Sequence, residues 1–328
     1  MGPQSGHSRR DLDARENLAG AAVGEETNVE MQESAIEGPG AAKRVDVVIV
    51  NWNSNSLLRE CIAALDQSTI AAALRVIIVD NASSDRSSDG LSARNLDLTI
   101  LRNKRNLGFS VGCNMGAKHA GAEYLLFLNP DVRVETDTVE RTIRYLDDRP
   151  NSGVGVVGVQ LIDDGGHVQR SCARTPTGAS LLLSTIFLDR LTPFVPSHFL
   201  LEWDHATTRD VDQVMGAYLA VRRPLFERLG GFDERYFLYY EDLDLCVAAR
   251  AAGWKVVYYA GAVAQHVGGG TTAAIKVGRI FQLSSSRIKY AAKHHGLTVA
   301  GLLVVLTSVV EIPVRLLLLA AEKITQRL

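Results

Sequence analysis

Apolar runs alternate with amphipathic stretches through the first half of the chain. The run at 45–50 is β-branched except for Asp46, a pattern typical of a strand buried on both faces. Further strands are predicted at 74–79, 98–101 and 124–128, and helices at 56–65, 111–120 and 136–146. This alternation predicts an α/β fold with a mostly parallel sheet and flanking helices.

The composition divides the chain into three segments. Residues 1–43 are rich in Gly, Glu, Ser and Ala without a sustained apolar period, which predicts a disordered N-terminal tail. Residues 44–275 carry the strand and helix pattern and are expected to form one α/β domain. Residues 276–328 are expected to form apolar C-terminal helices. The N-terminus has no apolar stretch of the kind that a secretory signal needs, so we expect a cytoplasmic protein.

The C-terminal segment poses a membrane question. Residues 296–321 are about long enough to cross a bilayer, but Glu311, Pro313 and Arg315 interrupt them. Buried charges are costly in lipid, so two shorter helices are expected, either lying in the membrane interface or packed on the α/β domain. The four-residue spacing of Glu311 and Arg315 allows an ion pair on one helix face. Basic residues that precede the segment suit an anionic cytoplasmic leaflet: Arg287, Lys289 and Lys293.

Composition narrows the function classes. The chain has 46% apolar residues, 22% charged residues and a formal net charge of −2, so it lacks the basic footprint of a nucleic-acid partner. Its four cysteines stand far apart without zinc or redox spacing, and buried free thiols are expected: Cys61, Cys113, Cys172 and Cys246.

Polar residues follow three of the predicted strands, at 50–53, 79–85 and 128–131. In parallel sheets, ligands bind beyond the carboxyl ends of the strands. An Asp there can bind a base or ribose, and another near phosphates can hold a divalent cation. A single Asp is more often a turn or cap residue, but three such strand ends at one sheet edge favour a ligand site.

An aromatic and acidic segment at 236–245 suggests catalysis. Glu241 and Asp242 open a predicted helix, where capping alone would explain them. They also follow tyrosines that could wall a sugar site, so one of them is a candidate general base. His266 precedes a glycine run; a lone His is more often structural, and it matters only if the fold brings it to Asp131.

Together these motifs resemble the inverting family 2 glycosyltransferases of the GT-A (Rossmann-like) fold, especially the bacterial rhamnosyltransferase-like branch. The resemblance runs from about residue 45 to 270. It is carried by residues 48–53, 79–85, 106–109 with Gly112, Asn114 and Gly116, then 128–131, 230–234, 240–245 and His266.

The resemblance implies a role for each matching residue. The nucleotide would be bound by Val50, Asn51 and Asp80. The donor would also contact Asn106, Gly108, Phe109, Asn114, Asn129 and Asp131. Asn129 replaces the first acid of the family's Asp-any-Asp motif, so Asp131 would be the main ligand of Mg²⁺ or Mn²⁺, with His266 as the second.

The resemblance also implies the chemistry. Asp242 would be the general base, with Glu241 as the second candidate. Gly216, Tyr218 and Tyr240 would shape the acceptor pocket. The expected reaction is inverting transfer of rhamnose from a dTDP-linked donor, or of a hexose from a UDP-linked donor. The acceptor would be a glycan or polyprenyl-linked saccharide in cell-envelope synthesis, at the inner face of the plasma membrane.

Two alternatives remain at this stage. A sugar nucleotidyltransferase also combines a nucleotide-binding α/β domain with a metal, but residues 51–56 lack its glycine-rich basic loop. A non-catalytic binding module of the same fold would not need Asp80, Asp131, Asp242 and His266 together. The released product separates the three functions. A glycosyltransferase releases nucleoside diphosphate, a nucleotidyltransferase releases pyrophosphate, and a binding module releases neither.

Overall fold

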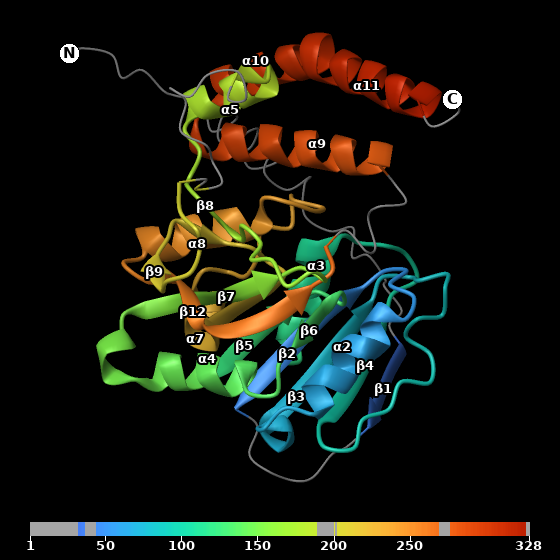
Figure 1. The fold of residues 1–328 in the computed structure, drawn as a ribbon, viewed down its shortest axis with the longest axis vertical. Coiled ribbons are helices and arrows are strands. Elements are labelled where there is room, and N and C mark those ends of the chain that lie inside the picture. Colours follow the sequence, from blue (N-terminus) through green and yellow to red (C-terminus); the bar gives the residue numbers. More distant parts are fainter. Residues whose placement is uncertain (1–31, 37–43, 189–199, 201, 269–275, 326–328) are drawn as a thin grey trace, which may run out of the picture. The chain divides into compact units, whose positions relative to one another are not determined.

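Four parallel strands form the first half of a single large sheet. The computed structural model describes residues 32–36, 44–188, 200, 202–268 and 276–325. The four strands are β2 (Val45–Asn51), β3 (Leu74–Asp80), β4 (Asp97–Arg102) and β5 (Tyr124–Leu128), and they lie in the order β4-β3-β2-β5 (Figure 1). The predicted strands and their parallel pairing are confirmed.

A short strand lies inside the segment predicted to be a tail. β1 (Gln32–Ile36) pairs antiparallel with β4 and forms one edge of the sheet. The other residues of the predicted tail up to 43 lie outside the described residues.

The second half of the sheet mixes directions. β11 (Tyr218–Arg222) runs antiparallel between β5 and β7 (Val154–Ile162). β12 (Lys255–His266) is parallel to β7, and β6 (Val132–Val134) pairs antiparallel with its end. β9 (Arg209–Asp210) also pairs with β12, while β8 (Cys172–Ala173) and β10 (Gln213–Val214) form a separate ladder. A mostly parallel sheet with an antiparallel insertion is therefore the observed architecture.

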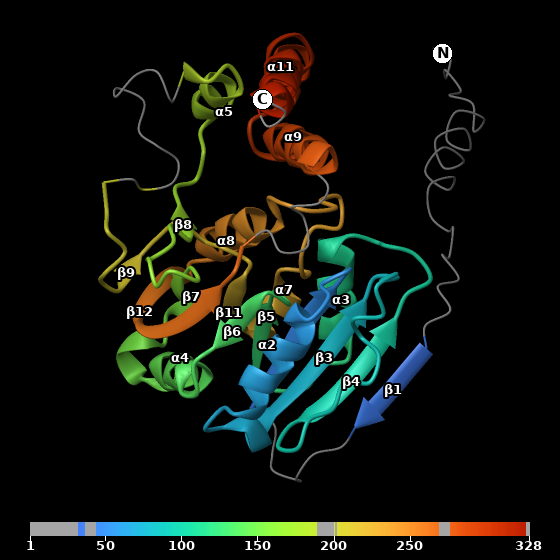
Figure 2. The same cartoon turned by 45° about the vertical axis from the view of Figure 1, so that its right-hand side comes forward.

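Helices cover both faces of the sheet (Figure 2). α2 (Leu57–Asp66) and α4 (Thr138–Asp147) share one hydrophobic core with the strands. α3 (Phe109–Lys118), α7 (Arg223–Arg228) and α8 (Glu241–Ala251) share the core on the opposite face. The mostly apolar strand interiors are explained by this double coverage; in β2 the buried Asp46 is the exception and pairs with Arg75.

α3 approaches the sheet unusually closely. A Cβ at Gly116 would lie 2.4 Å from Val48 Cγ1, and one at Gly112 would lie 2.9 Å from Val50 Cγ1. Glycine at these two positions, one helical turn apart, lets α3 lie against β2 beside the polar strand ends.

The C-terminal helices form a further layer with its own apolar core. They are α9 (Lys276–His294), α10 (Leu297–Leu306), the π-helical turn η4 (Thr307–Glu311) and α11 (Ile312–Thr325). α5 (Gly178–Thr185), from the middle of the chain, packs against α10. Tyr290 and Ala291 of α9 lie in one buried cluster with Ala300 and Leu303 of α10. Residues 32–325 of the described chain belong to one compact unit.

The expected break at Pro313 does not occur. The π-helical turn η4 immediately precedes this proline, and the helix continues into α11. A π turn already shifts the backbone hydrogen bonds, so the missing proline N–H is accommodated there without ending the helix. Within the described residues, 297–318 is therefore long and apolar enough to cross a membrane, with a mean hydropathy of 2.2 and only 22% of it buried.

The charges within this helix point inward. Arg315 Nε donates to Glu311 Oε1 at 3.0 Å, so the predicted pair on one helix face is confirmed. The other oxygen of Glu311 forms an ion pair with Arg287 of α9. Glu311 is 1% exposed. The outer surface carries exposed apolar side chains instead: Leu297, Leu302, Val304, Val305, Val309, Ile312, Leu316, Leu317 and Leu318.

Candidate active site

The ends of β2 and β3 form a hydrogen-bonded corner where the nucleotide is predicted to bind. Asn51 is fully buried, and its Nδ2 donates to Ser83 Oγ at 3.0 Å and Ser87 Oγ at 2.9 Å. It also approaches Asp80 Oδ2 at 3.4 Å. Asp80 accepts the backbone N–H of Ser83 at 2.8 Å. The side chain of Asn51 is enclosed, so it can influence a ligand only by holding Ser83, Ser87 and Asp80 in place.

The two loops that leave this corner are tied to each other. Asn53 Oδ1 accepts the N–H of Ser84 at 2.7 Å, and Asp85 Oδ2 accepts the N–H of Asn55 at 2.7 Å. The backbone of Asn53, Asn55 and Ala82 is left-handed, a conformation that is strained for Ala and tolerated by Asn. Such strain collects at functional loops that the surrounding contacts hold in place.

The turn before α3 brings a second segment to the same edge. Asn106 Oδ1 accepts the N–H of Gly108 at 2.9 Å. Gly108 has φ +91°, and a Cβ there would lie 2.7 Å from the carbonyl oxygen of Phe237. That carbonyl accepts the N–H of Phe109 at 2.7 Å. Glycine is thus required because the loop before α8 crosses directly over it.

Asn114 contacts protein rather than open space. Its Nδ2 donates to the Phe232 carbonyl at 2.8 Å and to Glu234 Oε1 at 3.0 Å, and its Oδ1 accepts the Phe232 N–H at 2.9 Å. In this structure the side chain fixes the loop before α8. Its role toward a donor stays a prediction.

Asp131 lies between β5 and β6, and His266 ends β12, 135 positions further along the chain; the pairing of β6 with β12 brings them together. His266 Nε2 lies 3.6 Å from Asp131 Oδ1, and both side chains are at least 90% buried. Gln169 donates its amide N–H to the His266 carbonyl at 2.7 Å, and its Oε1 lies 2.8 Å from His266 Nδ1. Because that oxygen can only accept, Nδ1 carries the proton and Nε2 presents its lone pair to Asp131.

This pair fits a divalent cation. Two acceptors, a carboxylate oxygen and an imidazole nitrogen, face each other beyond hydrogen-bond distance. Burial lowers the pKa of His266, although the Asp131 charge opposes it, so the ring favours the neutral form that a metal needs. Among the described residues no three His, Cys, Asp or Glu side chains form a cluster that could hold a metal ion.

Asp242 is the acid that the structure leaves partly open. The half-buried carboxylate accepts the N–H of Gly216 at 2.8 Å and of Leu243 at 2.7 Å. Burial raises its pKa, and hydrogen bonds from Gly216, Leu243 and Gln213 oppose that rise. A positioned carboxylate with a raised pKa is suited to accept a proton.

Glu241 points into the protein instead. It is 5% exposed, and its Oε2 has no hydrogen-bond partner within the described part of the chain. Burial, with the neighbouring Asp242 charge, raises its pKa well above the usual range. Burial of a carboxyl with an unpaired oxygen favours its protonated form, which makes Glu241 the weaker candidate for the base.

Backbone hydrogen bonds connect the segment that bears Asp131 to the segment that binds Asp242. The N–H of Asn129 donates to the Ala217 carbonyl at 2.9 Å, and the adjacent Gly216 binds Asp242. The antiparallel strand β11 therefore brings Asp131 and Asp242 to one edge.

The two tyrosines predicted to shape the acceptor pocket differ in exposure. Tyr218 is 1% exposed, and its hydroxyl contacts Thr142 Oγ1 of α4 at 2.9 Å, so its side chain is enclosed. Tyr240 is half-buried, and its ring packs 5.3 Å from that of Tyr290 on α9. The sequence analysis missed Gln169 and Gln213, because each acts through a partner far away in the chain.

The polar ends of β2 and β3, the Asp131–His266 pair and the Asp242 carboxylate thus lie at one edge of the sheet. The family model described as glycosyl transferase family 2 matches residues 46–201. The matched segment, just under half of the chain, is similar to this family.

Similar proteins carry related descriptions. The N-acetylglucosaminyl-diphospho-decaprenol L-rhamnosyltransferase of Mycobacterium tuberculosis is 28% identical over 236 residues, covering 67% of this chain and 75% of that protein. The O-antigen chain rhamnosyltransferase RfbN of Salmonella typhimurium is 26% identical over 235 residues, covering 68% and 66%. Among solved structures, the Pyrobaculum calidifontis mannosyltransferase PcManGT is 18% identical, with a TM-score of 0.46 over 82% of this chain and 80% of that one.

Proposed function

We propose that this glycosyltransferase moves L-rhamnose from a dTDP-linked donor to a polyprenyl-diphosphate-linked saccharide, with inversion. A UDP-linked hexose is the second candidate donor. The sugar and acceptor classes are supported by the descriptions of the mycobacterial and Salmonella relatives. The observation that carries the chemistry is the open Asp242, held by Gly216 beside the strand end that bears Asp131.

The residues divide the reaction between them. Asp80 and the loops tied to it bind the nucleoside, and Asp242 takes the proton of the acceptor hydroxyl. The hydroxyl oxygen then forms a bond to the anomeric carbon as the bond from that carbon to the diphosphate breaks, and nucleoside diphosphate leaves. Mg²⁺ or Mn²⁺ held by Asp131 and His266 would neutralise the charge of the departing diphosphate.

A site at the cytoplasmic face of the plasma membrane fits this acceptor. The exposed surface of α10 and α11 is apolar, because Glu311 and Arg315 pair inside. Residues 276–328 also contain eight Lys and Arg against two Glu, whereas the whole chain has a net charge of −2. An apolar face on a segment with an excess of basic residues favours binding flat on an anionic leaflet.

A donor panel tests the function. Purified protein is offered dTDP-rhamnose, UDP-hexoses and GDP-mannose with a short-chain polyprenyl-diphosphate N-acetylglucosamine, with and without Mg²⁺ or Mn²⁺. We expect dTDP release and rhamnosyl product with metal present. Pyrophosphate release would indicate a nucleotidyltransferase, and nucleotide binding without turnover would indicate a binding module.

A further inference from the structure

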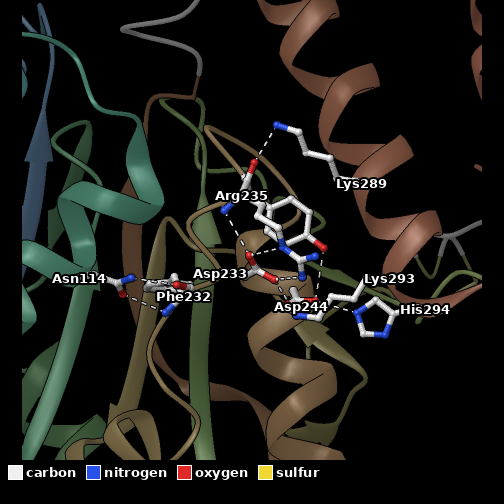
Figure 3. Close-up of polar contacts among 9 residues, drawn as sticks. Asn114, Phe232, Asp233, Arg235, Asp244, Lys289, Lys293 and His294 are labelled. Carbon is white, nitrogen blue, oxygen red and sulfur yellow. Dashed lines mark hydrogen bonds and ion pairs between the residues drawn. The ribbon is translucent and has the colours of Figure 1, made fainter. Parts of the chain in front are cut away.

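One face of α9 contacts the segment that leads to the catalytic acids (Figure 3). Ser286 Oγ donates to the Leu238 carbonyl at 2.8 Å, and Lys289 Nζ donates to the Arg235 carbonyl at 2.7 Å. Lys293 and His294 follow one turn later. Residues three, four, seven and eight apart share a helix face, so a single surface of α9 makes all these contacts.

Lys293 and His294 meet at Asp244. Lys293 Nζ donates to Asp244 Oδ2 at 2.7 Å and to Asp233 Oδ2 at 2.8 Å. His294 Nε2 lies 2.7 Å from Asp244 Oδ1, and the Tyr236 hydroxyl lies 3.4 Å from the same oxygen. Asp244 is 4% exposed. Both of its oxygens are therefore taken up by contacts that reach it from α9 and the loop.

The loop between α7 and α8 needs such support. Tyr239 and Tyr240 adopt left-handed backbone with φ of 70° and 71°, which is unfavourable for bulky side chains. From α3 the loop is held by Asn114 at the Phe232 carbonyl and by the N–H of Phe109 on the Phe237 carbonyl. From α9 it is held at Asp233, Arg235 and Leu238. The strained pair leads directly into Glu241 and Asp242.

Asp242 and Asp244 hold opposite sides of the same first turn. Two residues along a helix turn the side chain by about 200°, so Asp242 faces Gly216 and Gln213 while Asp244 faces α9. Any rotation of this turn moves both carboxylates. The contacts on Asp244 therefore fix the direction in which Asp242 points.

We propose that Lys293 and His294 of α9 are positioning residues that aim the Asp242 carboxylate at the acceptor hydroxyl. This inference rests on the proposed function, in which Asp242 is the base. It gives α9 a part in catalysis, in addition to its packing against α10.

The test compares Lys293→Met with Lys293→Arg, which retains the charge and donors. We expect Lys293→Met to lower kcat about 10- to 100-fold, the scale of a small misplacement of a reacting group. The KM for donor and the Kd for nucleoside diphosphate should stay within about twofold, because the nucleotide corner lies on other elements. Lys293→Arg should recover most of the kcat.

Two controls separate positioning from simple stabilisation. Arg279→Met removes an exposed basic side chain from the same helix and should leave kcat unchanged. In an Asp242→Asn background, Lys293→Met should have little further effect, since a residue that acts through the base loses its effect with it. Should Lys293→Met not fold, His294→Gln, which keeps a donor nitrogen, is compared with His294→Ala in the same assays.

Three results would overturn the inference: unchanged kcat in Lys293→Met, an equal loss in Lys293→Met and Lys293→Arg, or a full additional loss in the Asp242→Asn background. A wild-type chain that turns over no nucleotide sugar would refute the proposed function itself, and is recognised before any variant is compared.

Discussion

At the scale of single residues, two adjacent acids at the start of α8 have opposite surroundings. Asp242 is half-buried and held by backbone N–H groups, whereas Glu241 is enclosed with an oxygen that lacks a partner among the described residues. Neighbouring helix positions point about 100° apart, so one faces the open edge and the other faces the core. Their roles can therefore be separated by isosteric substitution.

Asp242→Asn is expected to lower kcat by about 10²- to 10⁴-fold, the usual contribution of a general base. Glu241→Gln should lose less than about 10-fold, because it replaces a neutral acid with a neutral amide of the same shape. Steady-state kinetics with nucleotide-binding titrations check both, and nucleoside diphosphate affinity should be unchanged in each. A larger loss for Glu241→Gln than for Asp242→Asn would reverse the assignment.

The pH dependence of kcat follows from the same site. Burial raises the pKa of Asp242, and only the carboxylate can accept a proton. Activity should therefore be present above this raised pKa and be lost as the pH falls through it, at a higher pH than the value of about 3.9 for an ordinary Asp. A profile of kcat at saturating donor and metal measures it; an acid limb at or below pH 4 would contradict the prediction.

Gln169 offers a test of the metal pair that does not depend on turnover. Gln169→Leu removes the acceptor that keeps the proton on Nδ1 of His266, and loss of such partners typically weakens metal binding 10- to 100-fold. Mn²⁺ titration followed by electron paramagnetic resonance, with nucleoside diphosphate present, measures the affinity. Asp131→Ala should weaken it further, and Gln265→Leu on the adjacent strand position serves as control. Equal Mn²⁺ affinity in all four proteins would contradict this metal site.

At the scale of elements, the C-terminal helices are joined by a buried ion pair. Glu311 of η4 accepts from Arg287 of α9 and from Arg315 of α11, and the side chains of Glu311 and Arg287 are 1% and 7% exposed. Breaking a buried pair leaves one charge without compensation. The packing of α10 and α11 on α9 therefore depends on Glu311.

Glu311→Ala should lower the free energy of unfolding by about 3–5 kcal/mol, the usual effect of breaking a buried pair. Urea unfolding measures the change. The matched control is Glu227→Ala, which breaks the exposed pair between Glu227 and Arg223 and should change stability by less than about 1 kcal/mol. Similar losses in the two variants would show that the pair at Glu311 is not a stabilising contact.

At the scale of the whole molecule, α9 connects the sheet edge that carries the candidate site to the apolar outer helices. The loop between α7 and α8 is hydrogen-bonded to one face of α9, and α10 packs on the same helix through Tyr290 and Ala291. The exposed apolar surface of α10 and α11 and the helix that bears Asp242 are therefore both packed on α9.

Binding to anionic vesicles tests this arrangement. Val309 and Leu317 are 68% and 71% exposed, and the double variant Val309→Asp and Leu317→Asp should abolish co-sedimentation with phosphatidylglycerol vesicles, because each charge opposes burial in the interface. Val168→Asp, at a 41% exposed position of the catalytic domain, should bind like wild type. If the double variant still binds vesicles, the face does not bind the membrane. If the wild type is a dimer and the double variant is a monomer, the face is a dimer interface.

The strand and helix alternation, the parallel first half of the sheet and the polar strand ends could be predicted from sequence, because each depends on neighbouring residues and on the period of burial. The antiparallel direction of β11 and the continuation of the helix through Pro313 could not. They depend on strand pairing and on a π turn, which leave no local signal.

The sequence by itself determined the α/β class, the motifs at the sheet edge and the pair formed by Glu311 and Arg315, since spacing along one element sets all of these. Only the tertiary structure decided which side chains work together. Gln169 reaches His266 across 97 positions, and His294 reaches Asp244 across 50. Such contacts are selected by packing in three dimensions and not by position along the chain.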